Sequence, residues 1–165
     1  MRGGVPGIHP VIGHLLRAIE QIREDAASAI GDLRPEQIWA KPHGLTSAGF
    51  HLKHLAGSTE RLSTYLSGGQ LTADQLTAIG TEGEGRETAE LLLAAVDESI
   101  KHYEALVRNL DPADFGAIRE VGRKRYQVTA ISLALHVAEH AQRHIGGLIA
   151  ACNLARFGAP TRPDS

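Results

Sequence analysis

Three histidines follow one another at a spacing of four residues near the C-terminal end of the chain: His136, His140 and His144. On an α-helix a step of four residues advances about 400°, so each imidazole lies one turn above the previous one with a drift of roughly 40°. Two imidazoles one turn apart can bind a single divalent metal ion. The alternative is a solvated edge, or histidines whose nitrogens are satisfied by neighbouring carbonyl groups.

The surroundings of these histidines favour a metal site over a solvated edge. They border the apolar face of their segment, with His144 deepest and His136 nearest the polar side. A second pair, His51 and His54, lies on or near the inward face of another segment with helical spacing. Three imidazoles drawn from two helices would leave one coordination position open, as a catalytic metal site requires.

Four segments with the apolar spacing of amphipathic helices must position these side chains. They are predicted at residues 9–33, 47–67, 87–110 and 128–155. Ser47 is the expected N-cap of the second helix and Gly68–Gly69 its stop, while Gly57 inside it either lets a neighbouring helix approach or only lowers helix stability. Four such helices predict an all-α four-helix bundle, a fold in which metal sites are built from side chains on facing helices.

Two connections are long enough to hold structure of their own. Residues 67–87 contain a predicted short helix, TADQLTAIG, followed by the acidic run TEGEGRE. Glu82 and Glu84 are candidate ligands in that run, but an acidic stretch between glycines is more typical of a solvated loop, which is the interpretation we favour. Residues 112–127 have no sustained period and are expected to form a crossover with a few extended residues around Gly122.

Composition and charge bound the class of protein. The 165 residues suffice for one domain, which we expect to span residues 1–165 with loose termini at 1–8 and 156–165. A net charge of −2 and a pI near 6.5 argue against nucleic-acid binding, which needs a concentrated basic face. A single cysteine, no apolar run of about 20 residues and no signal-peptide core favour a cytoplasmic protein without membrane contacts.

Two segments together resemble the DinB/YfiT-like family of metal-dependent enzymes. They are GFHLKHLAGSTERLSTYLSG and LHVAEHAQRHIGGLIA, and their order is similar to the ligand pattern of that family, a histidine on the second helix and an HxxxH pair on the last. Members are four-helix bundles that bind one divalent metal ion through three histidines, often as homodimers. The resemblance implies this fold, this cofactor and a homodimer for the present chain.

Carried over by position, the resemblance implies three metal ligands: His54, His140 and His144. His51 and His136 are then groups that contact the ligands or move protons, and each of them remains an alternative ligand. The family motif often continues as His-x-Gly-Gln, whereas Gly147 stands here at the glutamine position. Any role of that amide is therefore absent, which leaves substrate handling in question.

A divalent ion held by three neutral imidazoles keeps its positive charge and lowers the pKa of a bound water or thiol. The resemblance therefore implies a hydrolase, or a transferase of a low-molecular-weight thiol, acting on a small-molecule substrate. Zinc, nickel and iron all suit imidazole ligands, so the identity of the metal stays open. The glutamate of an HExxH motif has no counterpart, because Glu139 projects toward the polar side of its helix.

The competing interpretation is a non-enzymatic bundle whose metal site is structural or vestigial. A structural site is normally closed by a fourth protein ligand, a place that His51 or His136 would fill. Three protein ligands favour catalysis and four favour structure, so the coordination number separates the two interpretations. A third, that the histidines bind nothing, predicts full stability in the presence of a chelator.

Overall fold

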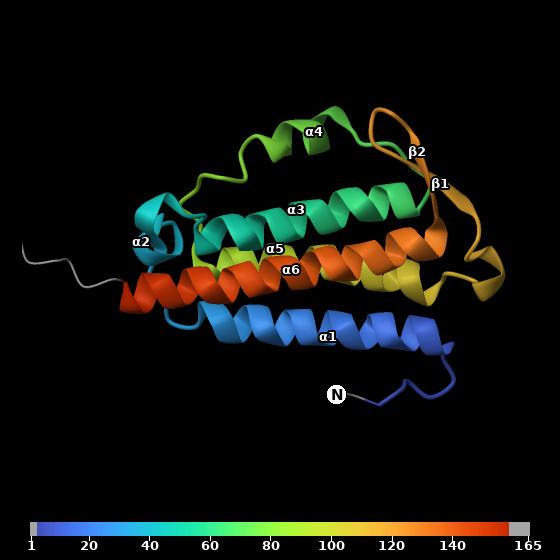
Figure 1. The fold of residues 1–165 in the computed structure, drawn as a ribbon, viewed down its shortest axis with the longest axis horizontal. Helices are drawn as coiled ribbons and strands as arrows, with labels where there is room; N and C mark the ends of the chain where they lie inside the picture. Colours follow the sequence, from blue (N-terminus) through green and yellow to red (C-terminus); the bar gives the residue numbers. More distant parts are fainter. Residues whose placement is uncertain (1–2, 159–165) are drawn as a thin grey trace, which may run out of the picture.

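Four long helices form the body of the molecule in the computed structural model, which describes residues 3–158 (Figure 1). They are α1 (Pro10–Ile30), α3 (Ala48–Leu66), α5 (Ala89–Arg108) and α6 (Ala130–Phe157). Both α1 and α3 pack against α5 and against α6, so α1 and α3 lie diagonally opposite each other. The shorter elements are α2 (Pro35–Ile38), α4 (Ala73–Ile79) and two 3₁₀ turns at Pro42–Gly44 and Pro112–Asp114. The predicted all-α class is confirmed.

The direction of the helices determines where the long connection runs. In Figure 1, α3 and α5 run in the same direction, and α1 and α6 run in the opposite one. The chain between α3 and α5 must therefore return along the length of the bundle. The predicted short helix α4 lies on this return, and the Thr72 side chain caps it by accepting a hydrogen bond from the Gln75 N–H at 3.2 Å. The return brings the acidic run that follows α4 beside α3.

The predicted helix boundaries agree with the structure to within a few residues. The Ser47 hydroxyl accepts a hydrogen bond from the Phe50 N–H at 3.1 Å, which confirms it as the N-cap of α3. The last helix, α6, starts at Ala130 because the residues before it are extended. The predicted loose ends fall partly on residues 1–2 and 159–165, which lie outside the described residues. Arg156, near the end of α6, donates to the carbonyl oxygens of Ala29 and Ile30.

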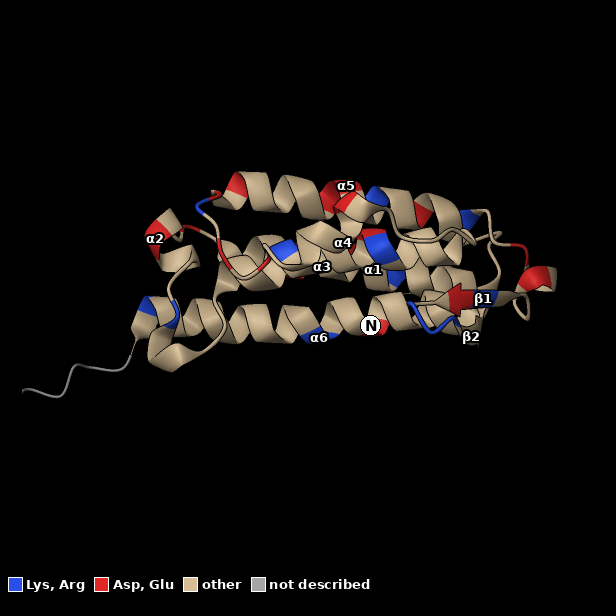
Figure 2. Ribbon diagram, turned by 90° about the horizontal axis from the view of Figure 1, so that it is seen from above, with Lys and Arg blue, Asp and Glu red and all other residues tan. Residues whose placement is uncertain are grey.

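The core lies between the four long helices and consists mainly of aliphatic side chains. Tyr103 is its largest fully buried side chain, and its hydroxyl donates to the Ala134 carbonyl at 2.6 Å. Trp39 packs over one end of the bundle, where its Nε1 donates to the Glu87 carbonyl. Charged residues are sparse along α6 (Figure 2). Across residues 3–158 no helix combines the length and apolar character that crossing a membrane requires.

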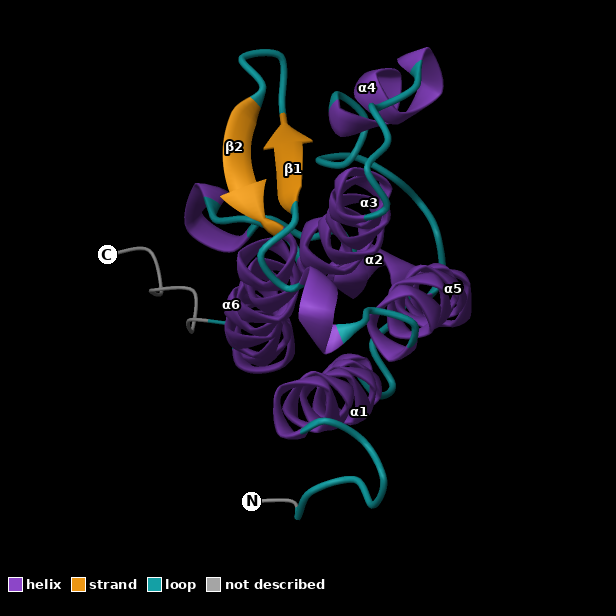
Figure 3. Cartoon of the chain, turned by 90° about the vertical axis from the view of Figure 1, so that its right-hand side faces the viewer, coloured by secondary structure: helices purple, strands orange, loops and turns teal. Residues whose placement is uncertain are grey.

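A β-hairpin connects α5 to α6 where only a few extended residues were predicted. Strand β1 (Ile118–Val121) pairs antiparallel with β2 (Tyr126–Thr129), and Gly122 adopts a φ of +73° at the turn. Viewed along the bundle, the hairpin stands above the ends of α3 and α6 (Figure 3). Arg119 Nε donates to the Leu66 carbonyl at 2.6 Å, which ties the hairpin to the end of α3.

Candidate metal centre

Three histidines meet where α3 faces α6. His54 projects from α3, and His140 and His144 project from adjacent turns of α6. Each offers one ring nitrogen, and these nitrogens all lie within 4.8 Å of one another. The ring centroid of His144 is 4.4 Å from that of His54 and 4.7 Å from that of His140. The three half-buried histidines that the family resemblance implied as ligands are therefore together in space, and we call them the histidine cluster.

The nitrogen spacing between His54 and His140 is close to that of two ligands on a tetrahedral metal ion. His54 Nε2 and His140 Nε2 lie 3.1 Å apart. Two nitrogens bound to zinc at about 2.0–2.1 Å with tetrahedral angles lie about 3.3 Å apart. A set of three imidazoles suits zinc, nickel and iron alike. The donor atoms and their spacing are therefore compatible with one divalent ion.

The two histidines of α6 are kept in the neutral form that binds metals. Burial, followed by the proximity of His54, His136 and Arg143, lowers the pKa of His140 to about 4. Burial, followed by the proximity of His54, also lowers the pKa of His144 to about 4. Because a metal ion competes with protons for the ring nitrogen, both imidazoles are ready to bind one at neutral pH.

A carboxylate from the connection between α4 and α5 orients His54. His54 Nδ1 donates to Glu82 Oε2 at 2.6 Å, so Nε2 of the same ring is the nitrogen that faces His140. Arg61 Nη1 donates to the other oxygen of Glu82, also at 2.6 Å. Glu82 is only 4% exposed, whereas Glu84 is exposed. The expectation of a solvated acidic loop is therefore wrong for Glu82.

The solvated-loop expectation fails at Glu82 because α3 offers a buried cation and a gap. Arg61 lies two turns after His54 and is 8% exposed, and a buried guanidinium needs an anionic partner. A Cβ at Gly57 would lie 2.6 Å from Glu82 Oε1 and 2.7 Å from Arg61 Nη1. Gly57 thus makes room for a loop carboxylate rather than for a neighbouring helix. The signal in the sequence is Arg61 itself, a basic residue on the inward face of a helix.

Two further histidines lie beside the histidine cluster without joining it. His51 Nδ1 is 3.1 Å from His144 Nδ1, and burial, followed by the proximity of His54, lowers the pKa of His51. His136 is exposed, and its ring centroid is 5.9 Å from that of His140. Among the described residues, neither belongs to the group whose nitrogens all lie within 4.8 Å of one another.

Gly147 and Phe50 set the packing around these rings. A Cβ at position 147 would overlap the imidazole of His51, so only glycine leaves space for the contact between His51 and His144. The His51 ring thus occupies space beside the position at which the family motif often has glutamine. Phe50 stacks on His54 with ring centroids 5.3 Å apart and an angle of 20° between the ring planes, which limits rotation of the ligand ring.

Two cavities open beside the histidine cluster. The smaller, of about 230 Å³, has His54 and His140 in its wall, so two of the three clustered rings border open space. The larger, of about 520 Å³, lies between the hairpin and α6. The two cavities share Leu62 and His136 as lining residues. Glu139 lines the larger cavity and not the smaller one, which agrees with its predicted position away from the cluster.

These features define a class of protein: an all-α bundle whose facing helices hold three histidines that can bind one metal ion. A family model described as the DinB superfamily matches residues 18–148, and the chain belongs to this superfamily. The matched region contains the whole histidine cluster together with His51, Glu82 and His136. No curated protein sequence matches the chain significantly.

Proposed function

We propose that the chain is a metal-dependent enzyme in which one divalent ion, zinc, nickel or iron, is bound by His54, His140 and His144. The observation that carries the proposal is the approach of three ring nitrogens within 4.8 Å, on two facing helices and beside a cavity. Three protein ligands leave a coordination position for water or substrate. The positions of His51 and His136 outside this group support a catalytic site over a structural one closed by a fourth ligand.

The ion would supply Lewis acidity and lower the pKa of a water or low-molecular-weight thiol at the open position, the chemistry of a hydrolase or a thiol transferase. The side chains of the protein prepare that position. Glu82 accepts the proton of His54 Nδ1 in a hydrogen bond, which leaves the lone pair of Nε2 for coordination. His51, in contact with His144, and His136, between the two cavities, are the side chains placed to hold or move a proton.

The metal content of the purified, untagged protein tests this proposal. After incubation with zinc, nickel or iron and gel filtration, we expect about one equivalent of metal in the wild type and its loss in His140→Ala. His102→Ala is the matched control because His102 is exposed on α5, outside the histidine cluster. The absence of metal from the wild type would overturn the proposal, and equal losses in the two variants would show that binding is not at the cluster.

Cobalt-loaded protein separates the two types of reaction. A low-molecular-weight thiol that binds the ion as a thiolate adds sulfur-to-cobalt absorption in the near ultraviolet, and a hydrolase without a thiol partner lacks this band.

The homodimer is part of the same proposal and rests on membership of the family. Light scattering coupled to gel filtration measures it, with a mass twice that of the 17.6 kDa chain expected.

A further inference from the structure

The larger cavity lies beneath the β-hairpin and has an apolar lining. Val121, Tyr126 and Val128 line it from the hairpin. Val121 pairs with Tyr126, and side chains two residues apart point to the same face of a strand, so all three project from one face of the sheet. The helices α6 and α3 complete the apolar wall with Leu133, Leu135 and Leu62. The volume of about 520 Å³ is typical of small-molecule sites, which span about 300–1,000 Å³.

This cavity adjoins the smaller cavity beside the histidine cluster. Leu62 and His136 line both cavities, and His54 and His140 line the smaller one. His136 lies one helical turn before His140 on α6, so it stands at the junction between the two spaces. A molecule whose reactive end approached the cluster through the smaller cavity would place its other end beneath the hairpin.

Charge in the lining restricts the chemistry of the group that can lie there. Glu139 is the one carboxylate among the lining residues, and no lysine or arginine is among them. Arg119 shares the inner face of the hairpin with its partner Val128, but it is not among the lining residues, and its Nε donates to the Leu66 carbonyl at the end of α3. An anionic group would therefore meet Glu139 without a counter-ion, whereas a neutral or amine-bearing apolar group meets no such cost.

We propose that the larger cavity is the subsite for an uncharged or amine-bearing, aromatic-sized group of the substrate. The role of the subsite in a reaction rests on the proposed function, but binding of such a group does not require the metal ion. The hairpin is then the element that selects substrates, and Val128 is the contact to test because it lies on β2, next to the start of α6, and lines the cavity.

Methyl NMR spectra of the full chain in chelator test the subsite with three probes of one shape: benzyl alcohol, benzylamine and benzoate. We expect the alcohol and the amine to shift the methyl signals of Leu62, Val128 and Leu135. Benzoate should bind at least about tenfold more weakly than either. Val128→Phe places a ring in the part of the cavity beneath the hairpin and should weaken binding by about tenfold or more. Gln127→Phe adds the same ring on the opposite, exposed face of β2 and should leave binding unchanged.

Equal effects of Val128→Phe and Gln127→Phe, or benzoate binding as tightly as benzyl alcohol, would overturn the subsite. If Val128→Phe does not fold, Leu135→Phe replaces it, because Leu135 is 37% exposed on α6 and tolerates a larger side chain. Zinc uptake is measured on separate samples of the same proteins without chelator and should not change in Val128→Phe. Probe binding in a chain that takes up no metal would support the subsite while overturning the proposed function, so the two failures are distinguishable.

Discussion

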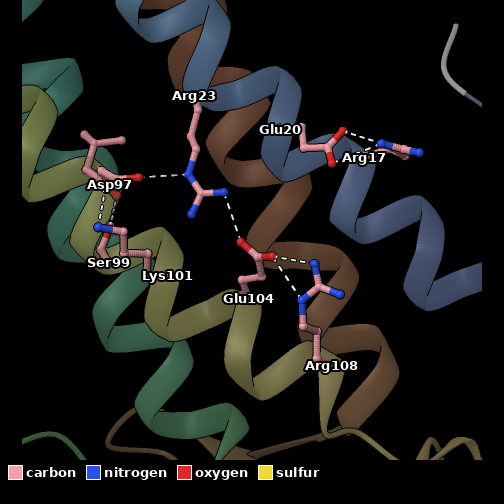
Figure 4. A network of polar contacts seen from close by, with 9 residues as sticks. Arg17, Glu20, Arg23, Asp97, Ser99, Lys101, Glu104 and Arg108 are labelled. Atoms are coloured by element: carbon pink, nitrogen blue, oxygen red, sulfur yellow. Dashed lines mark hydrogen bonds and ion pairs between the residues drawn. The ribbon is translucent and has the colours of Figure 1, made fainter. Parts of the chain in front are cut away.

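The seam between α1 and α5 and the seam between α3 and α6 use polar side chains in opposite ways. In the first, Arg23 of α1 donates to Asp97 at 2.9 Å and to Glu104 at 3.0 Å on α5. Each carboxylate also pairs with a cation of its own helix, Lys101 or Arg108, at 2.7 Å (Figure 4). Every charge in this network faces an opposite charge at the edge of the bundle, so the network joins helices, and none of its carboxylates belongs to the described group that could hold a metal ion.

In the seam between α3 and α6, imidazoles turn toward one another instead. His54 and His140 approach to 3.1 Å between their Nε2 atoms, and no carboxylate belongs to the described group of three ligand nitrogens. The charged groups lie on the Nδ1 side of His54, where the Glu82 carboxylate bonds both to His54 and to Arg61. The comparison teaches that ion pairs stabilise one seam, whereas the other holds its polar atoms in a geometry that a metal ion would complete.

Removing the buried carboxylate behind the cluster should have the largest effect. Glu82→Ala leaves the guanidinium of Arg61 buried without an anion, so we expect the free energy of unfolding to fall by about 3 kcal/mol. Loss of the hydrogen bond to His54 should lower metal affinity by about 10–100-fold. Urea unfolding and competition with a chelating dye measure the two effects. Glu84→Ala, an exposed carboxylate of the same connection, should change neither, and a matching loss there would indicate a general effect on the loop.

Acid should weaken the seam between α3 and α6 in a range of pH well above that of the other seam. The pKa of His140 and of His144 is about 4 in the folded chain and near 6.5 in the unfolded one. The unfolded chain therefore binds more protons between these values, and the metal-free protein loses stability as the pH falls from 6.5 toward 4. With their partial exposure taken into account, the loss is on the order of 2 kcal/mol.

The carboxylates of the seam between α1 and α5 should respond at lower pH. Hydrogen bonding to Lys101 lowers the pKa of Asp97. Burial opposes such a shift at Glu104, but hydrogen bonds from Arg108 and Arg23 outweigh it and lower the pKa of Glu104. Their stabilisation is present above the ordinary values of 3.8 and 4.5 and is lost as the pH falls below them. Thermal unfolding in chelator between about pH 7 and pH 3 separates the ranges. His140→Ala should reduce the loss of stability in the upper pH range alone. A change confined to the lower pH range would contradict the assignment of the upper range to the histidines.

A substitution in the ion-pair network should cost less than Glu82→Ala. Arg23→Ala is expected to lower the free energy of unfolding by about 1 kcal/mol, because the Arg23 side chain is 28% exposed and both of its partners keep a second cation. A double-mutant cycle with Asp97→Ala measures the coupling, and the metal content should not change. A loss as large as that of Glu82→Ala would remove the distinction between the two seams.

The sequence predicts the long helices and the pair His140 and His144 because both depend on local periodicity, whereas His54 was assigned to the same site through the family resemblance. An apolar repeat identifies the inward face of each helix, and a spacing of four residues places His140 and His144 on adjacent turns whatever the rest of the chain does. The contact of Glu82 depends instead on the path of the return between α3 and α5, which only tertiary packing decides. The hairpin was not predicted, beyond a few extended residues around Gly122, because each strand has four residues, too few for an alternating pattern to emerge.

Substitution of two adjacent glycines of α6 should change the free energy of unfolding least and tests the packing around the histidine cluster. A Cβ at Gly146 meets nothing within 4 Å, so Gly146→Ala should raise the free energy of unfolding by about 0.5–1 kcal/mol through helix propensity. A Cβ at Gly147 overlaps the His51 ring, so Gly147→Ala must displace this ring from His144 and lose that gain. Denaturant unfolding of the two variants measures the difference.

The imidazole NMR signals of the same variants show whether His51 is a fixed part of the site. Gly147→Ala should shift the ring signals of His51 and His144 and leave metal stoichiometry unchanged, because His51 lies outside the group of three nitrogens. Gly146→Ala should leave both sets of signals in place. If Gly147→Ala instead abolished metal binding, His51 would be needed as a fourth ligand, and the seam between α3 and α6 would hold a closed structural site rather than an open catalytic one.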